Sequence, residues 1–206
     1  ASHFGMAGVF RLLGSDIYGV GAIGQVPGPP LAPPPPAVNY LTALRRANQR
    51  LASCASLASL VETALGALAE EFGISQIMLL MHDEGRGRLY TLASRGYPES
   101  GIGSEIPVGA GVIGICARER TPIRIGFMTS EYAYGRTVRD GIAAEGQSDA
   151  LETAIPLPGL PEARSQLAVP ITAIDRLLGV LYVESVATLH FGYDDEDALV
   201  AFAAQF

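Results

Sequence analysis

Residues 165–185, SQLAVPITAIDRLLGVLYVES, contain the pattern that decides the fold of this protein. Within 167–173, apolar and less apolar positions alternate, which is the period of a β-strand with one face more buried than the other. Asp175 and Arg176 then form a polar break of the length that hairpin turns use. Residues 177–183 are apolar at almost every position, so we expect a second strand that is covered on both faces. The stretch predicts an antiparallel hairpin whose second strand is central in its sheet.

Two residues of this hairpin say more about the sheet. Pro170 has no N–H to donate, so the first strand needs an open edge or a bulge at that position. Gly179 inside an apolar strand indicates that another backbone or a ligand approaches closely. The hairpin by itself is a structural element and names no ligand.

The composition restricts the class of protein. With 206 residues, of which 49% are hydrophobic, the chain suits one domain with a real core plus an extension. A net charge of −7 argues against a nucleic-acid-binding surface. All 14 basic residues are arginine, which excludes an enzyme that uses a lysine Schiff base. No stretch approaches the length of an apolar membrane span, so we expect no membrane partner.

The cysteines and the acidic run at 194–197 carry no metal signature. Cys54 and Cys116 lie far apart and form no CxxC motif, so they predict neither a zinc site nor a disulfide framework. A reducing, cytoplasmic location is the natural expectation. Consecutive acids on a helix point in different directions, so residues 194–197 favour a helix cap over a metal site.

Residues 1–39 differ in composition from the rest of the chain. Residues 1–5 precede Met6 and look like a remnant of an expression vector, and 6–39 read as a Gly/Pro-rich extension and linker. The prolines within 27–36 favour an extended polyproline II conformation. Such a tract is usually a semi-rigid spacer, and a proline-binding module is the alternative reading.

From residue 40 onward the patterns predict a folded α+β domain. Apolar residues at helical spacing indicate helices over 41–51 and 57–72, and Gly73 ends the second of them. A short helix is expected at 112–118 and a final helix from 194 onward, cut short by the end of the sequence. Strands are predicted at 76–81, 89–93, 105–108 and 122–125, followed by the hairpin.

Residues 109–114, GAGVIG, match the GxGxxG pattern of dinucleotide-binding turns. The helix that follows is too short for that fold, and the next strand runs into 125–127 with no acid to hold a ribose hydroxyl. We therefore predict no dinucleotide site. The helix N-terminus remains suited to an anionic part of some other ligand.

This order of elements resembles a GAF domain, the sensory relative of the PAS fold. The resemblance covers residues 40–206 and is carried by IPVGAGVIG at 106–114, Thr121-Pro122, SQLAVP at 165–170 and LGVL at 178–181. It implies an antiparallel sheet of about six strands, with the terminal helices on one face and short helices and loops over a ligand pocket on the other. It also implies a regulatory module, often a homodimer through its terminal helices, that passes a signal to an output domain outside this sequence.

The first candidate ligand-binding residues lie in the long insert between 127 and 165, since long connections often form lids or binding loops. Tyr132, Tyr134, Arg136 and Arg139 combine flat apolar surface with fixed positive charge. These groups suit a planar, anionic small molecule such as a cyclic nucleotide. The alternative is a solvated loop in which the arginines pair with neighbouring acids.

Five further candidates follow from where the resemblance places the pocket. Ile113 and Cys116 lie in the short helix beside it, and Ser165 and Gln166 open the closing strand. Arg124 lies in the strand before the insert, where it points inward if the strand parity allows.

Other functions are less well supported by the residues. A free methionine sulfoxide reductase of this family needs a nucleophilic cysteine with a resolving cysteine nearby, and Cys54 is not close to Cys116 in the sequence. A bilin-binding cysteine is commonly followed by histidine, whereas Cys116 is followed by Ala117. Neither His82 nor His190 is placed as a haem ligand. No metal or haem is therefore expected, and the effector's identity is unknown.

A ligand-free dimerisation scaffold is the main alternative to a sensor. Its support is the apolar faces of the terminal helices, which we expect to pair between chains. These faces carry Leu41, Leu44 and Leu51 in the first helix and Leu199, Phe202 and Phe206 in the last. Our prediction is a non-enzymatic sensor domain that binds a small molecule.

Overall fold

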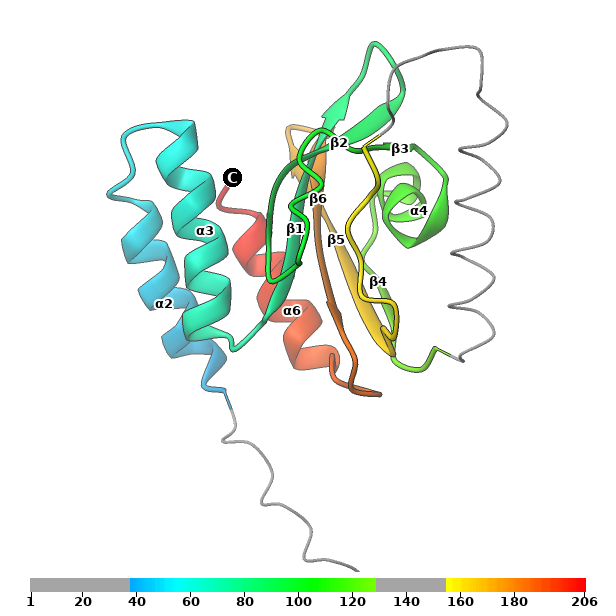
Figure 1. Ribbon diagram of the computed structural model, residues 1–206. Coiled ribbons are helices and arrows are strands. Elements are labelled where there is room, and N and C mark those ends of the chain that lie inside the picture. The colour runs from blue at the N-terminus through cyan, green and yellow to red at the C-terminus, as the bar shows by residue number, and fades with distance from the viewer. Residues whose placement is uncertain (1–37, 129–154) are drawn as a thin grey trace, which may run out of the picture. The chain divides into compact units, whose positions relative to one another are not determined.

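A six-stranded antiparallel sheet, in the order β3-β2-β1-β6-β5-β4, forms the centre of the molecule (Figure 1). The computed structural model describes residues 38–128 and 155–206. The strands are β1 Gln76–Asp83, β2 Arg88–Arg95, β3 Glu105–Pro107, β4 Ile123–Ile125, β5 Ser165–Ala173 and β6 Arg176–Ser185. The helices are α2 Tyr40–Leu51, α3 Leu57–Glu71, α4 Gly111–Glu119 and α6 Tyr193–Ala203. The predicted α+β class, with six strands, is confirmed.

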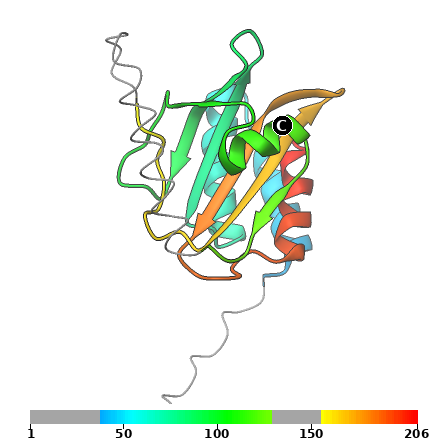
Figure 2. The same ribbon diagram turned by 90° about the vertical axis from the view of Figure 1, so that its right-hand side faces the viewer.

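Helices cover both faces of the sheet (Figure 1 and Figure 2). On the helical face, α3 and α6 pack against the strands and α2 packs on both helices. On the α4 face, α4 packs against β5 and β6. Alternating residues of each strand supply two separate apolar cores. Leu79, Leu167 and Leu181 belong to the core of the helical face, and Met78 and Val180 to that of the α4 face.

The hairpin forms as predicted, but its turn lies one residue earlier. Ala173 pairs with Arg176, which leaves Ile174 and Asp175 as the turn, both with positive φ (48° and 61°). A two-residue hairpin turn of this kind requires left-handed backbone at both positions. The prediction placed the turn at Asp175 and Arg176 because both are polar. Strand register, and not side-chain polarity, decides which residues form the turn.

Pro170 and Gly179 have the structural roles that were expected. Pro170 lies past the end of β4, which pairs only with 166–168, so β5 has an open edge there. A Cβ atom on Gly179 would clash with the carbonyl oxygen of Leu80 in β1. The close neighbour of Gly179 is therefore backbone, and β6 lies between β1 and β5 as predicted.

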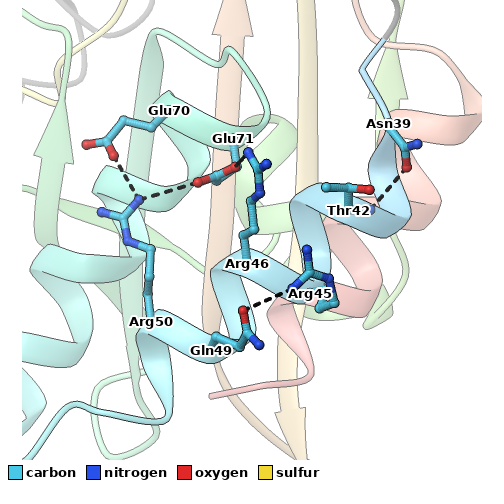
Figure 3. A network of polar contacts seen from close by, with 8 residues as sticks. All are labelled: Asn39, Thr42, Arg45, Arg46, Gln49, Arg50, Glu70 and Glu71. Atoms are coloured by element: carbon cyan, nitrogen blue, oxygen red, sulfur yellow. Dashed lines mark hydrogen bonds and ion pairs between the residues drawn. The ribbon is translucent and has the colours of Figure 1, made fainter.

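Polar contacts fasten α2 to α3 (Figure 3). Arg50 Nη1 donates to Glu70 Oε2 at 2.8 Å, and Arg46 Nη1 donates to Glu71 Oε2 at 3.3 Å. Exposed pairs of this kind contribute up to about 1 kcal/mol each. The position of α2 therefore depends mainly on its buried residues, such as Ala47 and Leu51.

The ends of two helices follow the sequence signals. Gly73, just beyond α3, adopts the left-handed φ of 70° that a C-terminal glycine provides. At the start of α6, Asp195 Oδ2 accepts a hydrogen bond from the backbone N–H of Gly192 at 2.8 Å. The acidic run therefore caps α6, as predicted.

The apolar faces of the terminal helices are used within the chain. Leu199 and Phe202 are completely buried, and Leu51 is 7% exposed. Leu41 is the exception, at 83% exposed. Most of the apolar residues expected to pair between chains therefore pack in or against the core of the helical face, and Leu41 remains exposed.

None of the described helices is long and apolar enough to cross a membrane. Residues 1–37, which include most of the predicted linker and the segment interpreted as a vector remnant, lie outside the described residues.

Candidate functional site

The structure separates the predicted site residues into three groups. Tyr132, Tyr134, Arg136 and Arg139 lie outside the described residues. Arg124 and Ser165 belong to the helical face of the sheet. Ile113, Cys116 and Gln166 belong to the α4 face and lie among its buried residues.

Arg124 faces α6 and does not reach the α4 face. Its Nε donates to Glu196 Oε2 at 2.9 Å, and its guanidinium carbon lies 4.1 Å from the centroid of the Tyr193 ring. The hydrogen bond with Glu196 raises the pKa of Arg124. The orientation follows from register, because Arg124 pairs with Leu167, whose side chain belongs to the core of the helical face. Arg124 thus ties β4 to α6.

Ser165 and Gln166 are neighbours in β5 and therefore point to opposite faces. Ser165 Oγ donates to the carbonyl oxygen of Ala187 at 2.8 Å, which fixes the loop between β6 and α6. Gln166 points to the α4 face, like Ala168 two residues later. Of this pair, Gln166 alone is in a position to contact a ligand on the α4 face.

Glu184 and Tyr182, which sequence reasoning missed, form a buried polar cluster with Gln166. Glu184 Oε2 accepts from the Tyr182 hydroxyl at 3.0 Å and from Gln166 Nε2 at 3.4 Å. Glu184 Oε1 accepts from the backbone N–H of Leu160 at 2.7 Å. Glu184 is 1% exposed, so its carboxylate depends on these three donors in place of water. We call Gln166, Tyr182 and Glu184 the Glu184 cluster.

One acceptor of the Glu184 cluster has no donor. Gln166 Oε1 is buried and has no hydrogen-bond partner among the described residues. Turning the amide over would place Oε1 against the Glu184 carboxylate, so the network fixes its orientation. A buried acceptor without a partner costs about 1–3 kcal/mol. The α4 face therefore holds a buried, oriented acceptor that no described residue satisfies.

A second buried polar pair on the same face is satisfied internally. Thr91 Oγ1 and Ser104 Oγ lie 2.9 Å apart and share a hydrogen bond. Thr91 pairs with Leu80 in the sheet and so shares its face. This pair thus differs from Gln166, whose Oε1 has no partner among the described residues; on the helical face, buried Asn48 Oδ1 of α2 also has none.

A signal for the two missed residues is present in the sequence. Tyr182 and Glu184 share the strand parity of Val180, so all three point to the α4 face. Glu184 also lies directly opposite Gln166 in the hairpin register. An acid at the end of an otherwise apolar strand, paired with a glutamine, was the available indication of a polar site.

The two cysteines lie on opposite sides of the sheet. Cys116 is completely buried in α4, and burial raises the pKa of its thiol to about 12. Cys54 lies between α2 and α3, where its Sγ is 3.4 Å from Thr63 Oγ1. Both thiols are free. A thiol that stays protonated and has no second thiol beside it is a poor nucleophile.

We predict that iodoacetamide alkylates the half-buried Cys54 in the folded protein, whereas Cys116 reacts only after unfolding. The unfolded thiol ionises near its ordinary pKa of about 9, and the folded one keeps its proton until about 12. The contribution of Cys116 to the free energy of unfolding is therefore present below pH 9 and falls as the pH rises toward 12. Mass spectrometry after alkylation, and urea unfolding at several pH values, measure the two effects.

The matched variants for this prediction are Cys54→Ala and Cys116→Ala. Cys116→Ala should lessen the loss of stability above pH 9, and Cys54→Ala should leave Cys116 protected. Rapid alkylation of Cys116 in folded Cys54→Ala would contradict the prediction.

The glycines of 109–114 have structural explanations. Gly109 and Gly111 have positive φ values of 93° and 58°. A Cβ atom on Gly114 would clash with the carbonyl oxygen of Pro107. The pattern thus lets α4 begin tightly against the end of β3.

No group of three or more metal-binding side chains occurs within 38–128 and 155–206.

Comparison with known proteins identifies the family. A family model described as GAF domain matches residues 54–206. The chain therefore belongs to the GAF domain family, as its resemblance implied. No curated protein matched the sequence.

Several solved structures share the fold. The GAF domain of the Acinetobacter phosphoenolpyruvate-protein phosphotransferase is 23% identical, with a TM-score of 0.60 over 80% of this chain and 88% of that one. Free methionine-R-sulfoxide reductase from Neisseria meningitidis, solved with its substrate, is 22% identical, with a TM-score of 0.60 over 84% and 89%. The A. aeolicus NLH2 GAF domain in an inactive state is 15% identical, with a TM-score of 0.55 over 81% and 91%. At such identities the likeness shows the fold alone, and the family includes both regulatory domains and enzymes.

Proposed function

We propose that this GAF domain is a cytoplasmic regulatory module that binds a small molecule on its α4 face, with Gln166 as the polar contact. The open acceptor at Gln166 Oε1 is the observation that carries the proposal. A core residue selected for stability alone has no reason to keep an unpaired buried acceptor. The bound molecule supplies the missing donor.

The ligand carries a hydrogen-bond donor on a compact, largely apolar body. Residues around the Glu184 cluster, such as Met78 and Ile113, are apolar, and both Gln166 Oε1 and the Glu184 carboxylate accept hydrogen bonds. A purine with an exocyclic amino group satisfies these requirements. Arg136 and Arg139, outside the described residues, are proposed to hold its phosphate, which makes a purine cyclic nucleotide the first candidate.

The proposed role is regulatory and not catalytic. The reductase among the similar structures is described as bound to its substrate, and the fold is compatible with such an activity. In this chain, however, Cys116 is buried and protonated, and Cys54 is on the other side of the sheet. Binding is proposed to alter the packing of the helices, which pass the signal to an output domain outside this sequence.

A thermal-shift titration of the full chain with cAMP, cGMP and cIMP tests the proposal. The amino-bearing nucleotides are expected to raise Tm in a saturable way. At a ligand concentration a hundredfold above Kd, binding adds about 2.7 kcal/mol to the free energy of unfolding. cIMP lacks the exocyclic amino group and should bind more weakly. Gln166→Met keeps the side-chain volume, removes the acceptor and should abolish the shift.

Ser165→Ala is the matched control, because it changes the neighbouring residue on the opposite face. It should retain the ligand-dependent shift even if it lowers Tm. No saturable shift with any of the three nucleotides would reject the cyclic-nucleotide proposal and favour the ligand-free scaffold. An equal shift in Gln166→Met would move the binding site away from the Glu184 cluster.

A further inference from the structure

An apolar groove of about 650 Å³ lies between α3 and β2, on the helical face and away from the Glu184 cluster. Leu57, Val61 and Leu65 line it from α3 at spacings of four residues, which places them along one side of the helix. Leu92 and Ala93 line it from β2. Most of the lining residues are aliphatic.

The groove exists because the helices do not cover the whole sheet. Within the described residues, α3 and α6 lie over the strands, and α2 packs on these helices without reaching β2 (Figure 1). Tyr90 of β2, paired with Met81 of β1, is 38% exposed. An apolar strip along β2 is thus left uncovered beside α3.

Two opposite charges in the groove lack partners. Glu62 of α3 and Arg95 of β2 both line it, and neither forms a hydrogen bond or an ion pair with a side chain of residues 38–128 or 155–206. Every other arginine within those ranges donates a hydrogen bond from its side chain. Arg95 is the exception, and it lines the same groove as the unpaired Glu62.

We infer that a second copy of this chain docks in this groove to form a two-fold symmetric dimer. In a two-fold interface every contact between two different residues occurs twice. Glu62 of each copy would therefore face Arg95 of the other copy. An anionic amphiphile would suit Arg95 but be repelled by Glu62, and a cationic one the reverse. A second copy satisfies both charges.

The apolar part of the groove supports the same occupant. Leu57, at the start of α3, is 62% exposed, whereas Val61 and Leu65 farther along the same side are buried. An exposed leucine beside an aliphatic groove is self-complementary, since each copy offers one projection and one recess. The proposed interface is formed by α3 and β2 and not by the terminal helices, most of whose apolar residues pack in the core of the helical face. It leaves the α4 face free.

Sedimentation velocity of the full chain over a range of concentrations tests the inference. The mean mass should rise from monomer toward dimer with concentration. Glu62→Arg places arginine against arginine, and Arg95→Glu places acid against acid, so each variant should weaken association by at least about tenfold. Both side chains are exposed, so the variants are expected to fold, which Tm checks.

Mixing the two variants gives the decisive result. In the mixed dimer each substituted residue faces an opposite charge, so association should recover to near the level of the unchanged protein. Arg45→Glu, an exposed change on α2, is the control and should leave association unaltered. A protein that stays monomeric throughout, a dimer indifferent to both reversals, or a mixture that fails to recover would each overturn the inference. None of these outcomes depends on nucleotide binding.

Discussion

Phe202→Ala is expected to lower the free energy of unfolding by about 4 kcal/mol, the largest loss we predict for a single side chain. Phe202 is completely buried, and its ring centroid lies 5.9 Å from those of both Phe72 and Phe206 in edge-on contacts. Truncation removes the aromatic contacts and leaves a cavity between α6 and the end of α3. Because domains are typically stable by about 5–15 kcal/mol, such a loss threatens the fold.

Urea unfolding followed by circular dichroism measures this loss. Val200→Ala is the matched control, because Val200 lies on the same helix and is 40% exposed. We expect it to cost under about 1 kcal/mol. A similar loss for the two variants would mean that α6 is not anchored through Phe202.

Gly179→Ala is expected to cost about 3 kcal/mol, although it adds a single methyl group. The new Cβ atom would clash with the Leu80 carbonyl oxygen, and the Met81 Cα atom lies 3.3 Å away. These atoms are backbone of the neighbouring central strand, so they move only if β1 and β6 separate. The hydrogen-bonded centre of the sheet is therefore disturbed.

Gly85→Ala provides the comparison for Gly179→Ala under the same urea unfolding conditions. Gly85 lies between β1 and β2, and its added Cβ atom would come no closer than 3.4 Å to Asp83 Oδ1, a mobile side-chain atom. Its effect should be within about 0.5 kcal/mol. If Gly179→Ala lowers the free energy of unfolding as little as Gly85→Ala does, the backbones of β1 and β6 do not approach as closely as described.

The order of strands and helices was predictable because it depends on local periodicity. The apolar run at 177–183 identified a central strand, Gly73 the end of α3, and the acids at 194–197 the start of α6. The site residues were less predictable. Arg124 of β4 pairs with Leu167 of β5, which is the neighbour of Gln166. Arg124 and Gln166 therefore point to opposite faces of the sheet. A one-residue shift in register reverses every such assignment.

The residues that matter most for the proposed function were found through pairing. The sequence did not identify Glu184 as a site residue. Its role depends on Gln166 in the paired strand and on the N–H of Leu160, which is distant in the chain. The groove beside β2 likewise depends on how far the helices extend over the sheet, a property that no window of residues contains.

The amino-acid pattern was sufficient for the GAF fold, since burial periodicity, turn glycines and helix caps act within a few residues of one another. The tertiary structure decided the face of Arg124, the isolation of Cys116 from Cys54, the open acceptor of Gln166 and the unpaired charges of Glu62 and Arg95. Each of these depends on contacts between residues far apart in the chain, and it is strand register and helix placement that bring such residues together or keep them apart.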